Sequence, residues 1–226
     1  MGSSRLPGKM LADLGGVSTI ALIVRRVRQA LRIDDVVVAT TDSPADDLLA
    51  AAAEAEGVAV FRGSEDDVLD RVVRAQQMMR SDIVVEINGD CPLLDPAIID
   101  RAIERFTAGD CDLVTTTAVQ SYPEGMDVQV FALPELEWVA GNISDADVHE
   151  HVSLYFYHHP ERYRIANLEA PADLAAPDLR LLLDYPDDLD RLRAIHTALA
   201  PVHGDAYALA DIMALLSAPA GKAAAR

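Results

Sequence analysis

The sequence predicts an α/β protein with a mostly parallel sheet and helices on both faces. From residue 18 to about residue 117, short runs of β-branched and aliphatic residues alternate with segments of helical spacing. Several of the runs are apolar throughout, which is typical of strands covered on both faces. With 226 residues, half of them hydrophobic, the chain supports one domain over residues 1–226. Ligands of such sheets bind at the carboxyl ends of the strands.

Local signals place the elements of this first part in order. A helix is expected over residues 19–31, where aliphatic residues recur every three or four positions between arginines. Ser43 and Ser64, each followed by acids, mark the starts of two further helices, because a capping hydroxyl and negative charge suit a helix N-terminus. The remaining elements are strands at residues 36–39, 58–61, 83–87 and 113–117, and a helix at residues 96–106.

The pattern changes after residue 120. We expect an excursion from the sheet over residues 120–168. This excursion either contacts an acceptor substrate or forms a subunit interface. Its elements are a strand at 126–131, a weaker helical segment at 149–158 and an extended segment at 163–167. The chain then returns through an apolar strand at 179–183 and ends with helices at 186–199 and 207–216.

Composition narrows the classes of function. The formal net charge of -18 excludes a nucleic-acid partner, because binding a polyphosphate strand needs a basic surface. Two cysteines are too few for a disulfide framework, and the sequence shows neither a signal peptide nor a membrane span. A soluble, cytoplasmic protein without a membrane partner is therefore expected.

The first nine residues have the composition of a phosphate-binding loop. Gly2, Ser3 and Ser4 allow backbone N–H groups to surround an anion, Arg5 can bind its oxygens as a fork, and Lys9 adds a point charge. The alternative is an ordinary solvated chain end. The charge of this loop is the first of three signals for an anionic ligand.

The other two signals are aspartates that follow predicted strands. Asp90 lies in the turn after the strand at 83–87, and Asp184 directly follows the strand at 179–183. Two carboxylates at one sheet edge, with phosphate oxygens and water, form a site suited to Mg²⁺. Each aspartate taken alone is equally consistent with a turn or helix cap. We assign Asp187 and Asp188 to the helix start after Pro186.

Three other groups are weaker candidates. His149 and His151 are two residues apart, which is unlike the i, i+4 spacing of zinc ligands on a helix. Cys91 is expected to be a small buried thiol. Thr40 follows a strand and so lies at the ligand edge, although capping of the next helix explains it equally well.

With these residues in place, the sequence resembles the cytidylyltransferases that activate acidic sugars, and most closely the branch of spore coat polysaccharide biosynthesis protein F. The matching segments run in family order at residues 1–9, 38–42, 61–71, 89–95, 150–152 and 179–184. The resemblance implies a nucleotide-diphosphosugar transferase-like (Rossmann-like) fold, with CTP as substrate and Mg²⁺ as cofactor. It also implies a homodimer built partly from the excursion after residue 120.

The same resemblance implies a role for each matching residue. Arg5 and Lys9 bind the triphosphate and contribute to catalysis, Asp90 and Asp184 hold Mg²⁺, and Ser3 and Ser4 shape the phosphate loop. Thr40 and Asp90 complete the nucleotide-binding set, and Glu150 and His151 lie on the acceptor side. The implied reaction transfers a cytidylyl group from CTP to a sugar acid in surface polysaccharide biosynthesis. Two alternatives are a non-catalytic nucleotide-binding homologue and a glycosyltransferase-like enzyme that uses a finished sugar nucleotide.

The chain departs from this pattern in two ways. Glu86, Asn88, Gln129 and His149 replace residues that are usually arginine, threonine, glutamate and arginine in relatives, so the acceptor sugar is left open. Relatives also place a hydrophobic strand directly before the residue that is Met1 here. We therefore expect Met1 to be an internal residue of the natural protein; without that strand its neighbours would expose unpaired edges.

Overall fold

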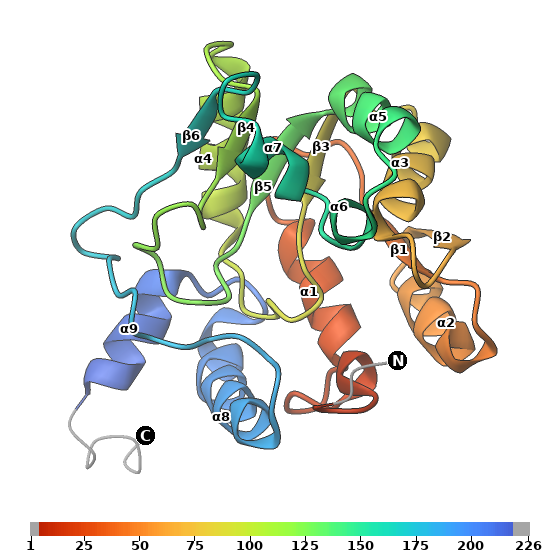
Figure 1. Cartoon of the computed structure of the whole chain (residues 1–226). Helices are drawn as coiled ribbons and strands as arrows, with labels where there is room; N and C mark the ends of the chain where they lie inside the picture. The colour runs from red at the N-terminus through yellow and green to blue at the C-terminus, as the bar shows by residue number, and fades with distance from the viewer. Residues whose placement is uncertain (1–4, 219–226) are drawn as a thin grey trace.

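The computed structural model describes residues 5–218 (Figure 1). The strands are β1 (Val37–Thr41), β2 (Ala59–Gly63), β3 (Ile83–Glu86), β4 (Leu113–Thr115), β5 (Gln129–Ala132) and β6 (Ile165–Asn167). The α-helices are α1 (Thr19–Val27), α2 (Asp47–Ala55), α3 (Val68–Met79), α4 (Pro96–Thr107), α5 (Leu133–Asn142), α6 (Ala146–Glu150), α7 (Leu154–His158), α8 (Pro186–His203) and α9 (Leu209–Ser217). Short 3-10 turns occupy Lys9–Leu11 and Pro44–Asp46.

The strands form two sheets. β1 and β2 pair in parallel, and β3, β5, β4 and β6 form a four-stranded sheet in that spatial order. β5 runs antiparallel to both β3 and β4, whereas β4 and β6 are parallel. The α/β class is therefore confirmed, but the excursion contributes a strand to the middle of the sheet, antiparallel to its neighbours.

Three local expectations are wrong in detail. The apolar run at 179–183 forms no extended strand; in the described part it makes a single bridge between Glu124 and Arg180. α5 was not expected, and the segment at 149–158 overlaps two short helices, α6 and α7, rather than forming one. The predicted helix start at Ser64 lies three residues early, because the Asp67 side chain caps α3 by accepting from the Asp70 N–H.

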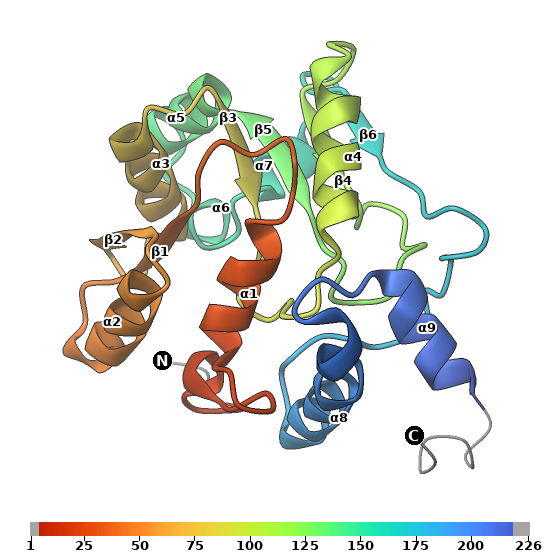
Figure 2. The same cartoon turned by 180° about the vertical axis from the view of Figure 1, so that it is seen from behind.

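Helices cover both faces of the larger sheet. In Figure 2, α1 and α4 lie in front of the strands, and α6 and α7 lie behind them. Ile98, Ile99 and Ala102 of α4 share one buried cluster with Val114 and Val130 of the sheet. A second buried cluster joins the opposite face of the sheet to α3, α5, α6 and α7.

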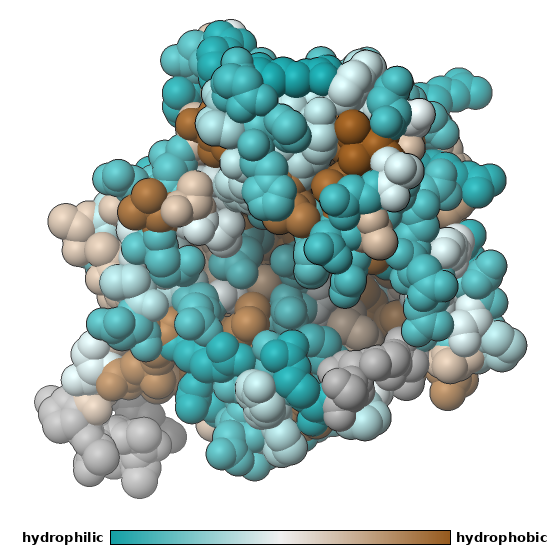
Figure 3. All heavy atoms as spheres, viewed as in Figure 1, coloured by the Kyte–Doolittle hydropathy of each residue, from teal (hydrophilic) through white to brown (hydrophobic). Residues whose placement is uncertain are grey.

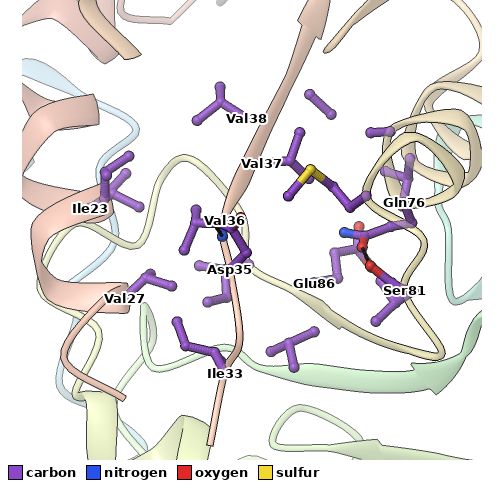
Figure 4. Close-up of a pocket in the computed structure, with 18 of the residues that line it drawn as sticks. Ile23, Val27, Ile33, Asp35, Val36, Val37, Val38, Gln76, Ser81 and Glu86 are labelled. Carbon is purple, nitrogen blue, oxygen red and sulfur yellow. Dashed lines mark hydrogen bonds between the residues drawn. The ribbon is translucent and has the colours of Figure 1, made fainter. Parts of the chain in front are cut away.

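A cavity separates the two sheets. It has a volume of about 830 Å³ and lies between β1 and β3, each of which pairs with another described strand along one edge only. Figure 4 shows the side chains of α1, β1 and α3 that surround it, together with Glu86 at the end of β3. Burial raises the pKa of Glu86 to about 7. Within residues 5–218, β1 and β3 therefore each keep one edge without a paired strand, and the expected strand before Met1 stays a prediction.

A buried guanidinium fastens α1 to the rest of the molecule. Arg26 is only 1% exposed and donates to the carbonyl oxygens of Leu93 at 3.1 Å, Leu94 at 3.1 Å, Asp205 at 2.7 Å and Tyr207 at 3.0 Å. The guanidinium also lies 4.2 Å from the centre of the Tyr207 ring. It therefore fixes the segment after Asp90 against the one that precedes α9.

The molecular surface is largely polar. Figure 3 shows one face, in which hydrophilic residues predominate and hydrophobic ones gather near α5 and α7. Within residues 5–218, none of the helices combines the length and the apolar character needed to cross a membrane.

Candidate functional site

The basic N-terminal loop lies against the aspartate that follows the returning segment. Lys9 Nζ is 3.1 Å from Asp184 Oδ1 and donates to the Leu183 carbonyl at 3.1 Å. Arg5 Nη2 donates to the same Asp184 oxygen at 3.0 Å. Since 174 residues separate Leu183 from Lys9, only the fold brings these charges together. Ser3 and Ser4 lie outside the described residues.

Asp90 lies in the turn that follows β3, beside Asp184. Its backbone carbonyl accepts from the Leu183 N–H at 2.8 Å, which joins the two aspartate-bearing segments directly. Lys9 Nζ is 3.6 Å from Asp90 Oδ2. Gly89 packs closely against Met10: a Cβ at position 89 would lie 2.8 Å from the Met10 sulfur and would displace the end of that flexible side chain. The structure thus brings together Lys9, Asp90 and Asp184, as the sequence predicts.

A second ion-pair network holds Asp184 in place. Arg180 donates to both carboxylate oxygens of Asp188, at 3.1 and 3.2 Å, and reaches Asp184 Oδ2 at 3.4 Å. Asp188 also accepts from the backbone N–H groups of Asp184 and Tyr185. Burial alone would raise the pKa of Asp188, but Arg180 and the two N–H groups outweigh it and keep the pKa low. Asp188 therefore has the helix-start role predicted for it and also positions Asp184.

A third carboxyl group, which the sequence reasoning did not select, lies near Asp90. Asp127 precedes β5, and burial, with a smaller contribution from the charge of Asp90, raises the pKa of Asp127 to about 6. The available signal was an acid within the otherwise apolar start of the run at 126–131. Cys91 is the predicted buried thiol, and burial raises the pKa of this thiol well above its usual value.

The remaining predicted site residues lie outside this cluster of contacts. The buried hydroxyl of Thr40 donates to Asp46 at 2.7 Å, an arrangement that favours the helix-start role left open by the sequence. Glu150 and His151 are exposed at the end of α6. For these three residues, ligand binding stays a prediction.

His149, next to them, has both ring nitrogens engaged. Nδ1 lies 2.7 Å from Asp67 Oδ1, and Nε2 lies 2.7 Å from the Ile143 carbonyl. Both partners are acceptors, so the two contacts are hydrogen bonds together only when the imidazole carries both protons. The Ile143 carbonyl and Asp67 accordingly raise the pKa of His149.

The donor set at the centre of the site fits a hard divalent cation. Lys9 Nζ already places one positive charge between the carboxylates of Asp90 and Asp184. In the part of the chain that the structure describes, no group of three or more histidine, cysteine, aspartate or glutamate side chains is arranged to hold a metal. Asp90 and Asp184 match the one or two carboxylates that Mg²⁺ commonly takes alongside phosphate oxygens and water, and binding of Mg²⁺ by this chain stays a prediction.

Comparison with known proteins agrees with this fold. The sequence model of the family described as cytidylyltransferase matches residues 1–196. Spore coat polysaccharide biosynthesis protein SpsF of Bacillus subtilis (strain 168) is 35% identical over 201 residues, which are 87% of this chain and 82% of that protein. A solved cytidylyltransferase from Leptospira borgpetersenii is 28% identical, with a TM-score of 0.87 over 96% of this chain and 90% of that one.

A more distant structure shares the fold. CMP:2-keto-3-deoxy-manno-octonic acid synthetase, solved in complex with CTP, is 20% identical, with a TM-score of 0.65 over 86% of this chain and 93% of that one. The fold is that of the nucleotidyltransferases. The chain belongs to the cytidylyltransferase family.

Proposed function

We propose that this protein transfers a cytidylyl group from CTP to a sugar acid, with Mg²⁺ as cofactor, in the synthesis of a surface polysaccharide. Family membership and the likeness to SpsF support the nucleotide and the pathway class. The likeness to a CMP-sugar acid synthetase crystallised with CTP supports the type of acceptor. The observation that carries the proposal is the meeting of Arg5 and Lys9 with Asp90 and Asp184.

The chemistry explains why this combination is useful. When a sugar hydroxyl attacks the α-phosphorus, negative charge grows on the phosphoryl oxygens and on the departing pyrophosphate. Arg5 and Lys9 would stabilise that charge, because cations fixed in advance lower the barrier most. Asp90 and Asp184 would hold Mg²⁺, which supplies Lewis-acid polarisation of the phosphoryl group. The predicted acceptor contacts are Glu150 and His151.

Pyrophosphate release tests the proposal. The protein is incubated with CTP, Mg²⁺ and each member of a panel of sugar acids. Release that depends on one acceptor supports the transfer. CTP binding without release on any acceptor supports a non-catalytic homologue, and activity only on finished sugar nucleotides supports a glycosyltransferase-like enzyme.

One substitution tests the assignment of the site itself. Asp90→Asn removes a metal-ligating charge, so turnover should fall at least about 100-fold while the melting temperature stays within a few degrees. Asp190→Asn is the matched control, because that carboxylate belongs to an exposed pair with Arg193. Full activity of Asp90→Asn would show that Asp90 is not a metal ligand.

We also propose that the chain forms a homodimer through the excursion after residue 120. Trp138 is 37% exposed, and its ring lies 6.0 Å from that of Tyr155, which contacts His159 in turn. Arg162 is stacked 3.5 Å from the centre of the Trp138 ring. Aromatic and arginine side chains are enriched at protein interfaces. Light scattering after size exclusion should give twice the chain mass, and Trp138→Glu should shift it to the monomer; a monomeric wild type would contradict the proposal.

A further inference from the structure

The position of Lys9 bears on how the metal and the nucleotide bind together. Its Nζ is 3.1 Å from Asp184 Oδ1, 3.6 Å from Asp90 Oδ2 and 3.1 Å from the Leu183 carbonyl, and its side chain is only 16% exposed. The ammonium thus bridges the two carboxylates assigned to the metal. Arg5, by contrast, pairs with Asp184, whose Oδ1 lies 3.0 Å from Arg5 Nη2.

We propose that the Lys9 ammonium takes the place of the divalent cation in the empty enzyme, and that Mg²⁺ and the triphosphate together displace it. The proposal rests on the proposed function, because the triphosphate supplies the new partner for Nζ. The Lys9 ammonium would repel a divalent cation held by Asp90 and Asp184, and its contacts with the two carboxylates would have to break. Metal binding without nucleotide is therefore opposed.

The displaced ammonium needs a new acceptor. Lys9 is the first residue of the short 3-10 turn Lys9–Leu11, and its long flexible side chain can move without unfolding an α-helix. Triphosphate oxygens replace the carboxylates and the Leu183 carbonyl as its hydrogen-bond partners. Binding of either ligand then lowers the free-energy cost of binding the other. The metal and the nucleotide therefore bind with positive coupling, which must be reciprocal.

This exchange differs from a purely structural role of Lys9. If Lys9 served only to fasten the basic loop to Asp184, its removal would loosen the metal site and weaken metal binding. If Lys9 competes with the metal, its removal leaves two unpaired carboxylates and strengthens metal binding. The two roles predict changes of opposite sign.

The test is a titration with Mn²⁺ alone, followed by electron paramagnetic resonance or calorimetry, on the wild type and Lys9→Met. Lys9→Met should bind Mn²⁺ about 10-fold more tightly than the wild type and CTP about 10-fold more weakly, within the range typical of coupled sites. Arg193→Met is the control for the loss of one positive charge, since its exposed pair with Asp190 is outside the site. Unchanged or weaker Mn²⁺ binding by Lys9→Met would overturn the exchange.

A measurement on the wild type covers the case in which the variant fails to fold. The chain contains only two lysines, Lys9 and Lys222, so selective ¹³C labelling of lysine gives two sets of side-chain signals. The Cε signal of Lys9 should shift when CTP and Mg²⁺ are both present and hardly at all with Mg²⁺ alone. An unmoved signal at saturating CTP and Mg²⁺ would refute the proposal. The titration with Mn²⁺ alone reports on the exchange even if CTP proves not to be the substrate.

Discussion

Arg26 offers the sharpest test of how this fold is held together. Its guanidinium is completely surrounded, donates to four carbonyl oxygens at 2.7–3.1 Å and lies against the ring of Tyr207. All four acceptors are uncharged, so burial lowers the pKa of Arg26. Arg26→Met keeps most of the volume and the stem but removes every one of these donors.

The expected cost follows from those contacts. Hydrogen bonds to a charged group contribute about 1.5–3 kcal/mol each, but the desolvation of the buried cation offsets much of their sum. The net change in the free energy of unfolding is set by the four carbonyl groups that lose their donors and by the lost contact with the Tyr207 ring. We expect Arg26→Met to lower the free energy of unfolding by about 3–5 kcal/mol. For a chain of this size, that corresponds to a fall of about 6–20 °C in melting temperature.

Urea unfolding, followed by circular dichroism, measures this cost. Arg25→Met is the matched control, because the neighbouring side chain is 46% exposed and pairs with Glu56 at 2.8 Å and Asp205 at 3.7 Å. An exposed pair contributes at most about 1 kcal/mol. A difference of less than about 1 kcal/mol between the two variants would refute the view that Arg26 is a structural anchor.

Three further changes test the cavity and its surroundings. The folded-state pKa of Glu86, about 7, is above its ordinary value of 4.5, so its contribution to stability is present below pH 4.5 and is lost as the pH rises through about 7. Glu86→Gln should remove this loss, a gain of about 2–3 kcal/mol at pH 8 in urea titrations, and an unchanged pH profile would contradict the burial of this carboxyl. Burial would raise the pKa of Asp46, but hydrogen bonds, among them those from Thr40 and Thr41, outweigh it and lower the pKa, so the contribution of Asp46 to stability is present above pH 3.8 and is lost on acidification. Asp46→Ala should cost about 1–3 kcal/mol at pH 7 and progressively less toward acid pH, and a constant cost would argue against the carboxylate as the cause. Finally, a β-branched six-residue segment fused ahead of residue 1 should pair with β1 and β3 and raise the melting temperature, whereas the same segment interrupted by proline should not.

Much of the candidate site could be predicted because its signals are local. A basic glycine- and serine-containing loop and an aspartate after an apolar run are visible without any knowledge of packing. Because ligands bind at the carboxyl ends of the strands, the sequence predicts that Asp90 and Asp184 lie close together. Within residues 5–218, the apolar run before Asp184 packs in the core and makes a single bridge, and Asp184 still lies beside Asp90 because burial placed it where a strand would have placed it.

Other features had no local signal. Arg25 and Arg26 read alike in sequence, yet one is exposed and the other buried, because only the folded chain decides which guanidinium meets the carbonyls of two distant segments. Asp127 looks like an interruption of an apolar run until β5 is seen beside β3. The antiparallel direction of β5 likewise depends on pairing with partners more than ten residues away in sequence.

The sequence by itself determined the α/β class, the helical start capped by Ser43, and the charges available to a phosphate and a metal, since each follows from residues within a few positions of one another. Only the tertiary structure decided that Lys9 bridges Asp90 and Asp184, that Arg180 and Asp188 hold Asp184 in place, and that a cavity lies between β1 and β3. These contacts join segments that the chain holds far apart, and their geometry depends on packing of the whole core.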